Sequence, residues 1–387
     1  MTEKEQIKKL FDERTARFIT ASNLQEPDYV PILSQINAYA IGYAGHTTWE
    51  VFEDYDLERE CYTKANTDFY FDGILMFGLN HPFKAYFDIG SPTYMVAENG
   101  VTIQHKESST MQTDEYDEFI ADPIKFIANK VGGRKIQGLN ADYPQSYQAL
   151  EKLLGKISEF KGNGAYNKKY VQEELGFPII SSRSAPNPCD NFFDFIRGFT
   201  GTLTDMRRDI SKVEKAVAAL TPYYEKSIPS AQEPQFPWLL STAHIAPFLS
   251  KKQFERLYWP YMKRCVEAAY NCGTKYICFM EGVWKQHYDL FDELPKGAYI
   301  AALESDDIFE FKKRFGDRIT IAGGMPQGML KYSSVQDCID YTKKVYDACA
   351  PGGGFIFTLD KAIVDPEDVN AETFRAVNEF AHEYGKY

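Results

Sequence analysis

The sequence has no apolar run of the roughly 20 residues that a membrane-spanning helix needs. It also has no excess of basic residues: Lys and Arg number 43 against 55 Asp and Glu, which gives a net charge of −12. A protein that binds the phosphate backbone needs a basic stripe, so this balance argues against nucleic acid as a partner. We therefore expect no membrane and no nucleic-acid partner, but a small-molecule ligand or a docked protein.

Short motifs with paired cysteines or histidines are missing as well. The 7 cysteines include no C-x-x-C pair, and neither an H-E-x-x-H motif nor a G-x-G-x-x-G motif after the first predicted strand is present. The chain starts with Met-Thr-Glu-Lys, where a secretory signal would have a charged segment followed by an apolar one. These features predict a reduced, cytoplasmic protein.

The composition is that of a globular protein, with 44% hydrophobic and 25% charged residues over 387 positions. A chain of this length buries roughly 75% of its unfolded surface, so it needs no metal or disulfide merely to fold. It is long enough for two domains or for one large α/β barrel. Aromatic residues reach 15%; we expect most of them in the core and a few around a flat ligand.

Apolar runs alternate with helical segments along the chain. Predicted strands lie near residues 30, 68, 178, 238, 275, 298, 318 and 354, after an amphipathic helix over 3–22. This alternation implies parallel pairing, and so many strands imply a (β/α)8 TIM barrel of the α/β class, with an open doubly wound sheet as the rival. We predict a single barrel domain over 1–387, with the helix of 3–22 as an N-terminal extension.

Two insertions interrupt the alternation. Asn99-Gly100 between two β-rich runs predicts an inserted β-hairpin over 83–108, because this dipeptide favours tight hairpin turns. Residues 109–175 are mostly polar and predict a helical insertion.

Several predicted strands end in a polar residue. His244, Glu281, Glu304 and Asp360 each follow an apolar run, and in TIM barrels the catalytic residues lie at the carboxyl ends of the strands. Imidazole and carboxylate are normal zinc ligands, so we predict a metal site on His244 and Glu281, with Asp360 or Glu304 as the third ligand. The alternative is that these are isolated polar residues held by nearby backbone or Arg.

Other residues after strand ends are candidates for substrate binding. Arg183 is predicted to bind a carboxylate through its planar fork, or else to form a structural ion pair. The aromatic residues that follow predicted strand ends are expected to line a pocket, or else to pack between the barrel and its helices. They are Phe192, Phe193, Phe195, Trp284 and Tyr288.

Two segments carry a resemblance to a known family. AYIAALESDDIFEFKKRFGDRITIAGGMPQGML and SSVQDCIDYTKKVYDACAPGGGFIFTLD resemble the carboxyl half of the uroporphyrinogen decarboxylase superfamily. PDYVPIL and FLSKKQFERLYWPYMKR are similar to it too, so the resemblance covers most of the chain. It implies a barrel enzyme from one of two branches: decarboxylases, or zinc-dependent methyltransferases that serve corrinoid proteins.

The resemblance favours the methyltransferase branch. The decarboxylases carry an R-Q-A-G-R-Y type motif for propionate groups, whereas ILSQINAYAIGYAG in this chain has no arginine. The methyltransferases often carry H-x-C-G after the fifth strand and a cysteine after the eighth; here Phe279 and Glu281 stand in the first motif, and Asp360 or Lys361 near the second cysteine. Nitrogen and oxygen ligands leave zinc a stronger Lewis acid, which suits a poor leaving group such as an ether.

The resemblance thus implies a zinc-dependent methyltransferase of the O-demethylase type, which moves a methyl group from a methoxylated aromatic to the cobalt of a corrinoid protein. Its implied catalytic residues are Glu281 and His244. Its implied metal ligands are His244, Glu281 and Asp360, and its implied substrate contacts are Arg183, Phe192, Trp284 and Glu304. The alternatives are a decarboxylase without a metal and a non-catalytic corrinoid-binding homologue.

Overall fold

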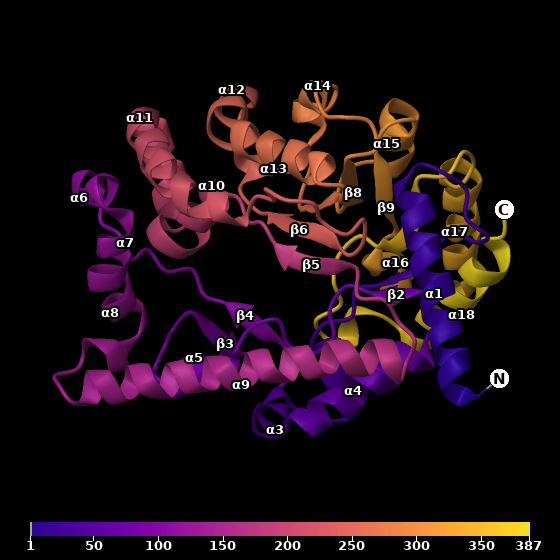
Figure 1. The fold of residues 1–387 in the computed structure, drawn as a ribbon, viewed down its shortest axis with the longest axis horizontal. Coiled ribbons are helices and arrows are strands. Elements are labelled where there is room, and N and C mark those ends of the chain that lie inside the picture. Colours follow the sequence, from indigo (N-terminus) through magenta and orange to yellow (C-terminus); the bar gives the residue numbers. More distant parts are fainter. Residues whose placement is uncertain (1) are drawn as a thin grey trace.

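Parallel strands form the centre of the protein, which is represented by a computed structural model that describes residues 2–387 (Figure 1). Strands β5 to β10 form a six-stranded sheet in the order β10-β9-β8-β7-β6-β5, and β1 pairs with β2 in parallel. Bridges between Ile32 and Phe357 and between Ile74 and Ile179 join the two sheets at both edges. The ring is therefore closed, which confirms the predicted TIM barrel and rules out the open sheet.

Within the described residues the barrel strands have these bounds: β1 Leu33–Ser34, β2 Gly73–Ile74, β5 Ser181–Ser184, β6 Trp238–Ala243, β7 Tyr276–Met280, β8 Tyr299–Leu303, β9 Thr320–Met325 and β10 Phe355–Leu359. Their positions agree with the predicted runs. Only the first two are much shorter than their apolar sequence suggests.

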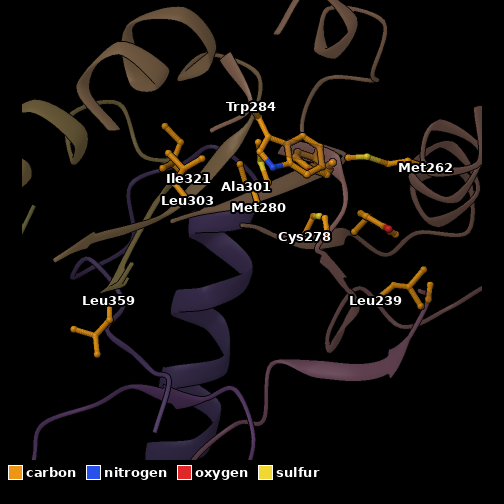
Figure 2. Close-up of a cluster of buried hydrophobic side chains, with 14 of the residues drawn as sticks. Leu239, Met262, Cys278, Met280, Trp284, Ala301, Leu303, Ile321 and Leu359 are labelled. Atoms are coloured by element: carbon orange, nitrogen blue, oxygen red, sulfur yellow. The ribbon is translucent and has the colours of Figure 1, made fainter. Parts of the chain in front are cut away.

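The strands are apolar on both faces because each face meets a different core. Ile277 and Ile300 point into the barrel and pack with its other inner residues. Their neighbours Cys278 and Ala301 point outward into the layer between strands and helices, where Figure 2 shows them beside Trp284. Successive residues of a strand face opposite ways, so continuous apolar runs are what a covered parallel sheet requires.

Helix α1 (Glu3–Ser22) closes the amino-terminal end of the barrel. It begins with a capping box between Thr2 and Glu5, and near its end Phe18 lies in the inner core, 6.1 Å from the ring of Trp238. Arg17 pairs with Asp72, whose second oxygen accepts the Ile32 N–H at 2.8 Å. The predicted N-terminal helix is confirmed, and its last turns close one end of the barrel.

Helices cover the outside of the barrel and follow most strands. They are α2 Tyr39–Tyr43, α3 Thr48–Glu53, α4 Tyr55–Asp68, α10 Pro188–Asn191, α11 Phe199–Tyr224, α12 Lys251–Gln253, α13 Trp259–Asn271, α14 Tyr288–Phe291, α15 Ile308–Phe315, α16 Gln327–Tyr332, α17 Val335–Cys349 and α18 Ala371–Tyr384. A π-helical turn, η3 (Phe192–Arg197), links α10 to α11, and a second, η6 (Phe254–Tyr258), links α12 to α13. Ser250 caps α12 through a capping box with Gln253.

The inserted hairpin is shorter than the sequence suggests. Strands β3 (Tyr94–Val96) and β4 (Ile103–His105) pair antiparallel, and Asn99-Gly100 makes the turn, with Gly100 at a φ of 73°. The preceding residues, predicted within the same hairpin, form helix α5 (Phe83–Asp88) instead, in which Phe83 and Ala85 are both buried.

The helical insertion contains α6 Tyr116–Ala121, α7 Pro123–Phe126, α8 Gly132–Lys135 and α9 Gln145–Glu173. In Figure 1, α6 to α8 stand to one side of the barrel, and the long α9 runs below the hairpin. Among the described residues, no helix combines the length and the apolar character needed to cross a bilayer.

Candidate functional site

The predicted site residues meet at the carboxyl end of the barrel. His244 directly follows β6, Glu281 follows β7, Glu304 follows β8 and Asp360 follows β10. Three of them, Glu281, Glu304 and Asp360, line a cavity of about 160 Å³ inside the mouth, together with Lys361. Parallel strands bring their carboxyl ends to one edge, and this is why residues far apart in sequence share one cavity.

His244 lies between two carboxylates. Its Nδ1 is 2.7 Å from Oδ2 of Asp194, and its Nε2 is 3.3 Å from Oε1 of Glu281. Asp194 is only 15% exposed, whereas Glu281 is 47% exposed. The buried carboxylate of Asp194 thus orients the imidazole through Nδ1. The more exposed carboxylate of Glu281 lies beside the other nitrogen, Nε2.

A second buried carboxylate fixes the backbone beneath His244. Oδ1 of Asp190 accepts the N–H groups of His244 and Ile245 at 3.0 and 2.9 Å, and its Oδ2 accepts the Tyr258 hydroxyl at 2.7 Å. Burial raises the pKa of Asp190 to about 6, against these hydrogen bonds and the charge of His244. Asp190 therefore positions the strand end that carries His244.

The carboxylates decide the charge of His244. Burial lowers its pKa, but the hydrogen bond to Asp194 and the charges of Glu281, Asp194 and Asp190 outweigh this effect and raise the pKa to about 9. Burial also raises the pKa of Glu281, and the nearby Glu304 raises it further while His244 opposes both. At neutral pH the site therefore holds an imidazolium with a proton on Nε2.

The predicted zinc ligands are not arranged as a metal site. Within residues 2–387, no group of three or more His, Cys, Asp or Glu side chains is placed to hold a metal ion. Nε2 of His244 lies 3.3 Å from Glu281, but Asp360 instead accepts the Gln327 N–H at 3.0 Å, so no third ligand joins this pair among the described residues. The residues in this arrangement do not fit the metal, so zinc on His244, Glu281 and Asp360 stays a prediction from the resemblance alone.

Two predicted substrate contacts lie in the core instead. The Trp284 side chain is fully buried (Figure 2), and its Nε1 donates to the Glu281 carbonyl at 2.9 Å. Phe192 is also fully buried, and its ring packs 5.6 Å from Phe119 of α6. The expectation that they wall a substrate pocket is corrected: an aromatic residue after a strand end packs under the next helix when that helix covers it.

Arg183 forms a structural ion pair, which was the alternative to its predicted role in binding a substrate carboxylate. Its Nη2 lies 2.7 Å from Oε1 of Glu233, in the segment that leads into β6. Glu304 remains at the mouth, where it accepts the Gly282 N–H at 2.5 Å. Of the four predicted substrate contacts, it is the one that lines the mouth cavity.

The sequence prediction missed Asp194 and Asp190. Both lie after β5, in the run Cys189-Asp190-Asn191-Phe192-Phe193-Asp194, of which the prediction included only Phe192 and Phe193. Their spacing of four residues places two carboxylates on one face of a helix, and this was the available signal.

These features define the chain as a TIM-barrel protein whose candidate site is a carboxylate-held histidine at the barrel mouth. The family model described as "Uroporphyrinogen decarboxylase (URO-D)" matches residues 170–384, more than half of the chain, and the protein belongs to this family.

Among solved structures, a methyltransferase from Methanosarcina mazei is similar, with a TM-score of 0.62 and 12% sequence identity over 96% of this chain and 98% of that chain. At this identity the likeness shows the fold. No curated protein matches the chain.

Proposed function

We propose that the protein is a methyltransferase that takes the methyl group from a methoxylated aromatic donor and passes it to the cobalt of a corrinoid carried by a partner protein. The observation that carries the proposal is the Asp194–His244–Glu281 arrangement at the mouth, whose carboxylates raise the pKa of His244 to about 9 and so favour a proton on Nε2 at neutral pH. The corrinoid supplies the nucleophile that accepts the methyl group. The chain's own residues supply the proton and the binding surface.

In this proposal His244 acts as a general acid. When the bond between methyl carbon and ether oxygen breaks, the oxygen leaves with the electron pair and takes the Nε2 proton, so that a phenol departs rather than a phenolate. Asp194 stays ionised at Nδ1 and keeps the ring in place. Proton donation by a positioned side chain contributes typically about 10²–10⁴-fold to a rate.

The charge of the mouth supports this function over a decarboxylase. Glu281, Glu304 and Asp360 face the mouth cavity with Lys361 as the one cation lining it among the described residues. Four propionate groups of a uroporphyrinogen would meet carboxylates there, and like charges repel. Since Arg183 is engaged by Glu233, it does not restore the missing cationic partners.

The test is a methyl-transfer assay with the full-length protein. A reduced corrinoid protein is mixed with a panel of aryl methyl ethers and methylamines, and methylation of the cobalt is followed by its absorbance. We expect transfer from at least one aryl ether, and its loss in His244→Gln, which keeps a polar side chain but has no acidic proton to transfer. His46→Gln is the matched control, because His46 is 37% exposed and pairs only with Glu50 within the described residues. Transfer from no compound of the panel would overturn the proposal.

Metal analysis tests the zinc prediction separately. Because no group of three His, Cys, Asp or Glu side chains within residues 2–387 is placed to hold a metal ion, we expect dialysed protein to retain zinc well below one atom per chain, and His244→Ala to retain the same amount. One zinc per chain that is lost in His244→Ala would establish the metal site instead.

A further inference from the structure

A second cavity, of about 350 Å³, lies beside the barrel and is built mainly from the insertions. His81 and Tyr86 line it from the α5 region, Tyr94 from β3, Lys135 from α8 and Phe195 from η3. Its lining is mostly apolar. Ligand pockets run from about 300 to 1,000 Å³, so this side cavity has room for a one-ring ligand and not for a tetrapyrrole.

Aromatic rings form one wall of the side cavity. Tyr94 stacks on Tyr86, with ring centroids 5.9 Å apart and planes 13° from parallel, and on His81 at 5.8 Å. His105 touches Tyr94 on one side at 5.3 Å and Phe195 on the other at 5.5 Å. Such a wall favours a planar ring, because aromatic groups gain by stacking or edge contact beyond their buried area.

Lys135 is the cation of the side cavity. Its Nζ lies 5.0 Å from the centre of the Phe195 ring, and none of the described carboxylates forms an ion pair with it. Lys130, one turn earlier, differs: it pairs with Glu115 and Glu118. Burial lowers the pKa of Lys135 to about 8, against the charge of Asp194. An ammonium in an apolar lining costs free energy until an anion reaches it.

The side cavity adjoins the candidate site. Phe195 follows Asp194 directly in η3, and Asp194 holds His244. A smaller cavity of about 150 Å³ shares His81 and Tyr94 with it and reaches Asn37, just beyond β1. A ligand in the side cavity therefore lies against the same turn that positions the histidine.

We infer that the side cavity binds a planar aromatic carboxylate, with the ring against Tyr94 and the carboxylate on the Lys135 ammonium. The inference deepens the proposed function and rests on it in one respect, since it takes the bound molecule to be the methyl donor. It names the class of donor: an aryl methyl ether that carries a carboxylate on its ring.

Calorimetric binding to the full-length protein, without any corrinoid, tests the inference. The probes are 4-methoxybenzoate and its neutral counterpart 4-methoxybenzamide. We expect Lys135→Gln to weaken benzoate binding at least tenfold and to leave amide binding unchanged, while Lys135→Arg keeps most of the benzoate affinity. Tyr94→Leu should weaken both probes. Lys125→Gln is the matched control, because Lys125 is exposed on the same insertion and lines no part of the cavity.

Equal benzoate affinity in wild type and Lys135→Gln would overturn the inference, and so would the absence of binding to wild type. Unchanged amide binding shows that Lys135→Gln is folded. Benzoate binding that depends on Lys135, without any methyl transfer, would keep the inference and remove the proposed function. Methyl transfer from neutral ethers, with no preference for ethers that carry a carboxylate, would keep the proposed function and remove the inference.

Discussion

The two ends of the barrel are built from the same strands but differ in what fills them. At the amino-terminal end, Phe18 of α1 packs on Trp238, and Arg17 and Asp72 pair where little water reaches. At the carboxyl end, Glu281, Glu304 and Asp360 line a cavity, and His244 lies beside Glu281. The closed end has an apolar plug with one buried ion pair, and the open end has a cavity lined by carboxylates.

This difference indicates that residues at the amino-terminal end of the barrel mainly stabilise the fold, whereas residues at the carboxyl end carry the proposed chemistry. A plug of apolar side chains contributes through buried area, which requires no particular charge. The mouth instead holds several carboxylates close together, and the buried Asp190 and Asp194 keep His244 in place there. Substitutions at the two ends should therefore affect different measurements.

The largest effect is expected at the open end. His244→Gln should lower the rate of methyl transfer by about 10²–10⁴-fold, because it removes the proton donor. The urea-unfolding free energy should change little above about pH 9, where the contribution of protonated His244 to stability is already lost. If His244→Gln lost stability but kept its rate of methyl transfer, the role of His244 would be structural and not catalytic.

The opposite result is expected at the closed end. Phe18→Ala should lower the free energy of unfolding by about 3–5 kcal/mol, because it leaves a cavity inside the barrel. The rate of methyl transfer per folded molecule should stay the same. Chemical denaturation and an assay at low temperature measure the two quantities, and a fall in rate without a fall in stability would contradict the separation.

A smaller effect concerns the charge of the mouth. Asp194→Asn should lower the pKa of His244 from about 9, because the hydrogen bond to a carboxylate is lost while burial remains. The folded pKa lies above the ordinary value of 6.5, so the stability that protonated His244 contributes is complete below that value. It is lost as the pH rises through about 9.

Nuclear magnetic resonance of the imidazole, with urea unfolding at several pH values, checks this prediction. Wild type should lose stability between these two pH values, and Asp194→Asn should lose less of it. An unchanged histidine pKa in the variant would count against the carboxylate as its cause.

The smallest effect tests the buried position of Trp284. Trp284→Phe should cost about 1 kcal/mol, because it removes the hydrogen bond from Nε1 to the Glu281 carbonyl. Binding of the aromatic probes should not change. If calorimetry showed weaker binding of the probes to Trp284→Phe, Trp284 would be a substrate contact, as the sequence predicted.

The barrel and part of its mouth could be predicted because their signals are local. Each strand is a short apolar run, and His244 and Glu281 directly follow such runs, so the rule that parallel strands converge was enough to pair them. The distance of 3.3 Å between Nε2 of His244 and Oε1 of Glu281 agrees with that rule. The turn at Asn99-Gly100 was equally local, since the dipeptide itself prefers it.

The remaining features depend on packing, which residue type does not reveal. Trp284 and Phe195 are both aromatic residues after strand ends, but one lies in the core and the other borders a cavity. Asp194 sits on a helix and reaches His244 across 50 positions of sequence. Lys135 faces the side cavity because the insertion folds back on the barrel, and no periodic pattern in its segment indicates this.

The closure of the barrel has a consequence for how the molecule opens. Strands β7 and β8 are aligned over five residue pairs, from Tyr276–Tyr299 to Met280–Leu303. The β1–β2 pair meets its neighbours through the bridges at Ile32–Phe357 and Ile74–Ile179. Local opening needs less free energy where fewer backbone hydrogen bonds and contacts must break. Amide protons of β1 and β2 should thus exchange with solvent before those of β7 and β8. The barrel should therefore begin to unfold at its first two strands.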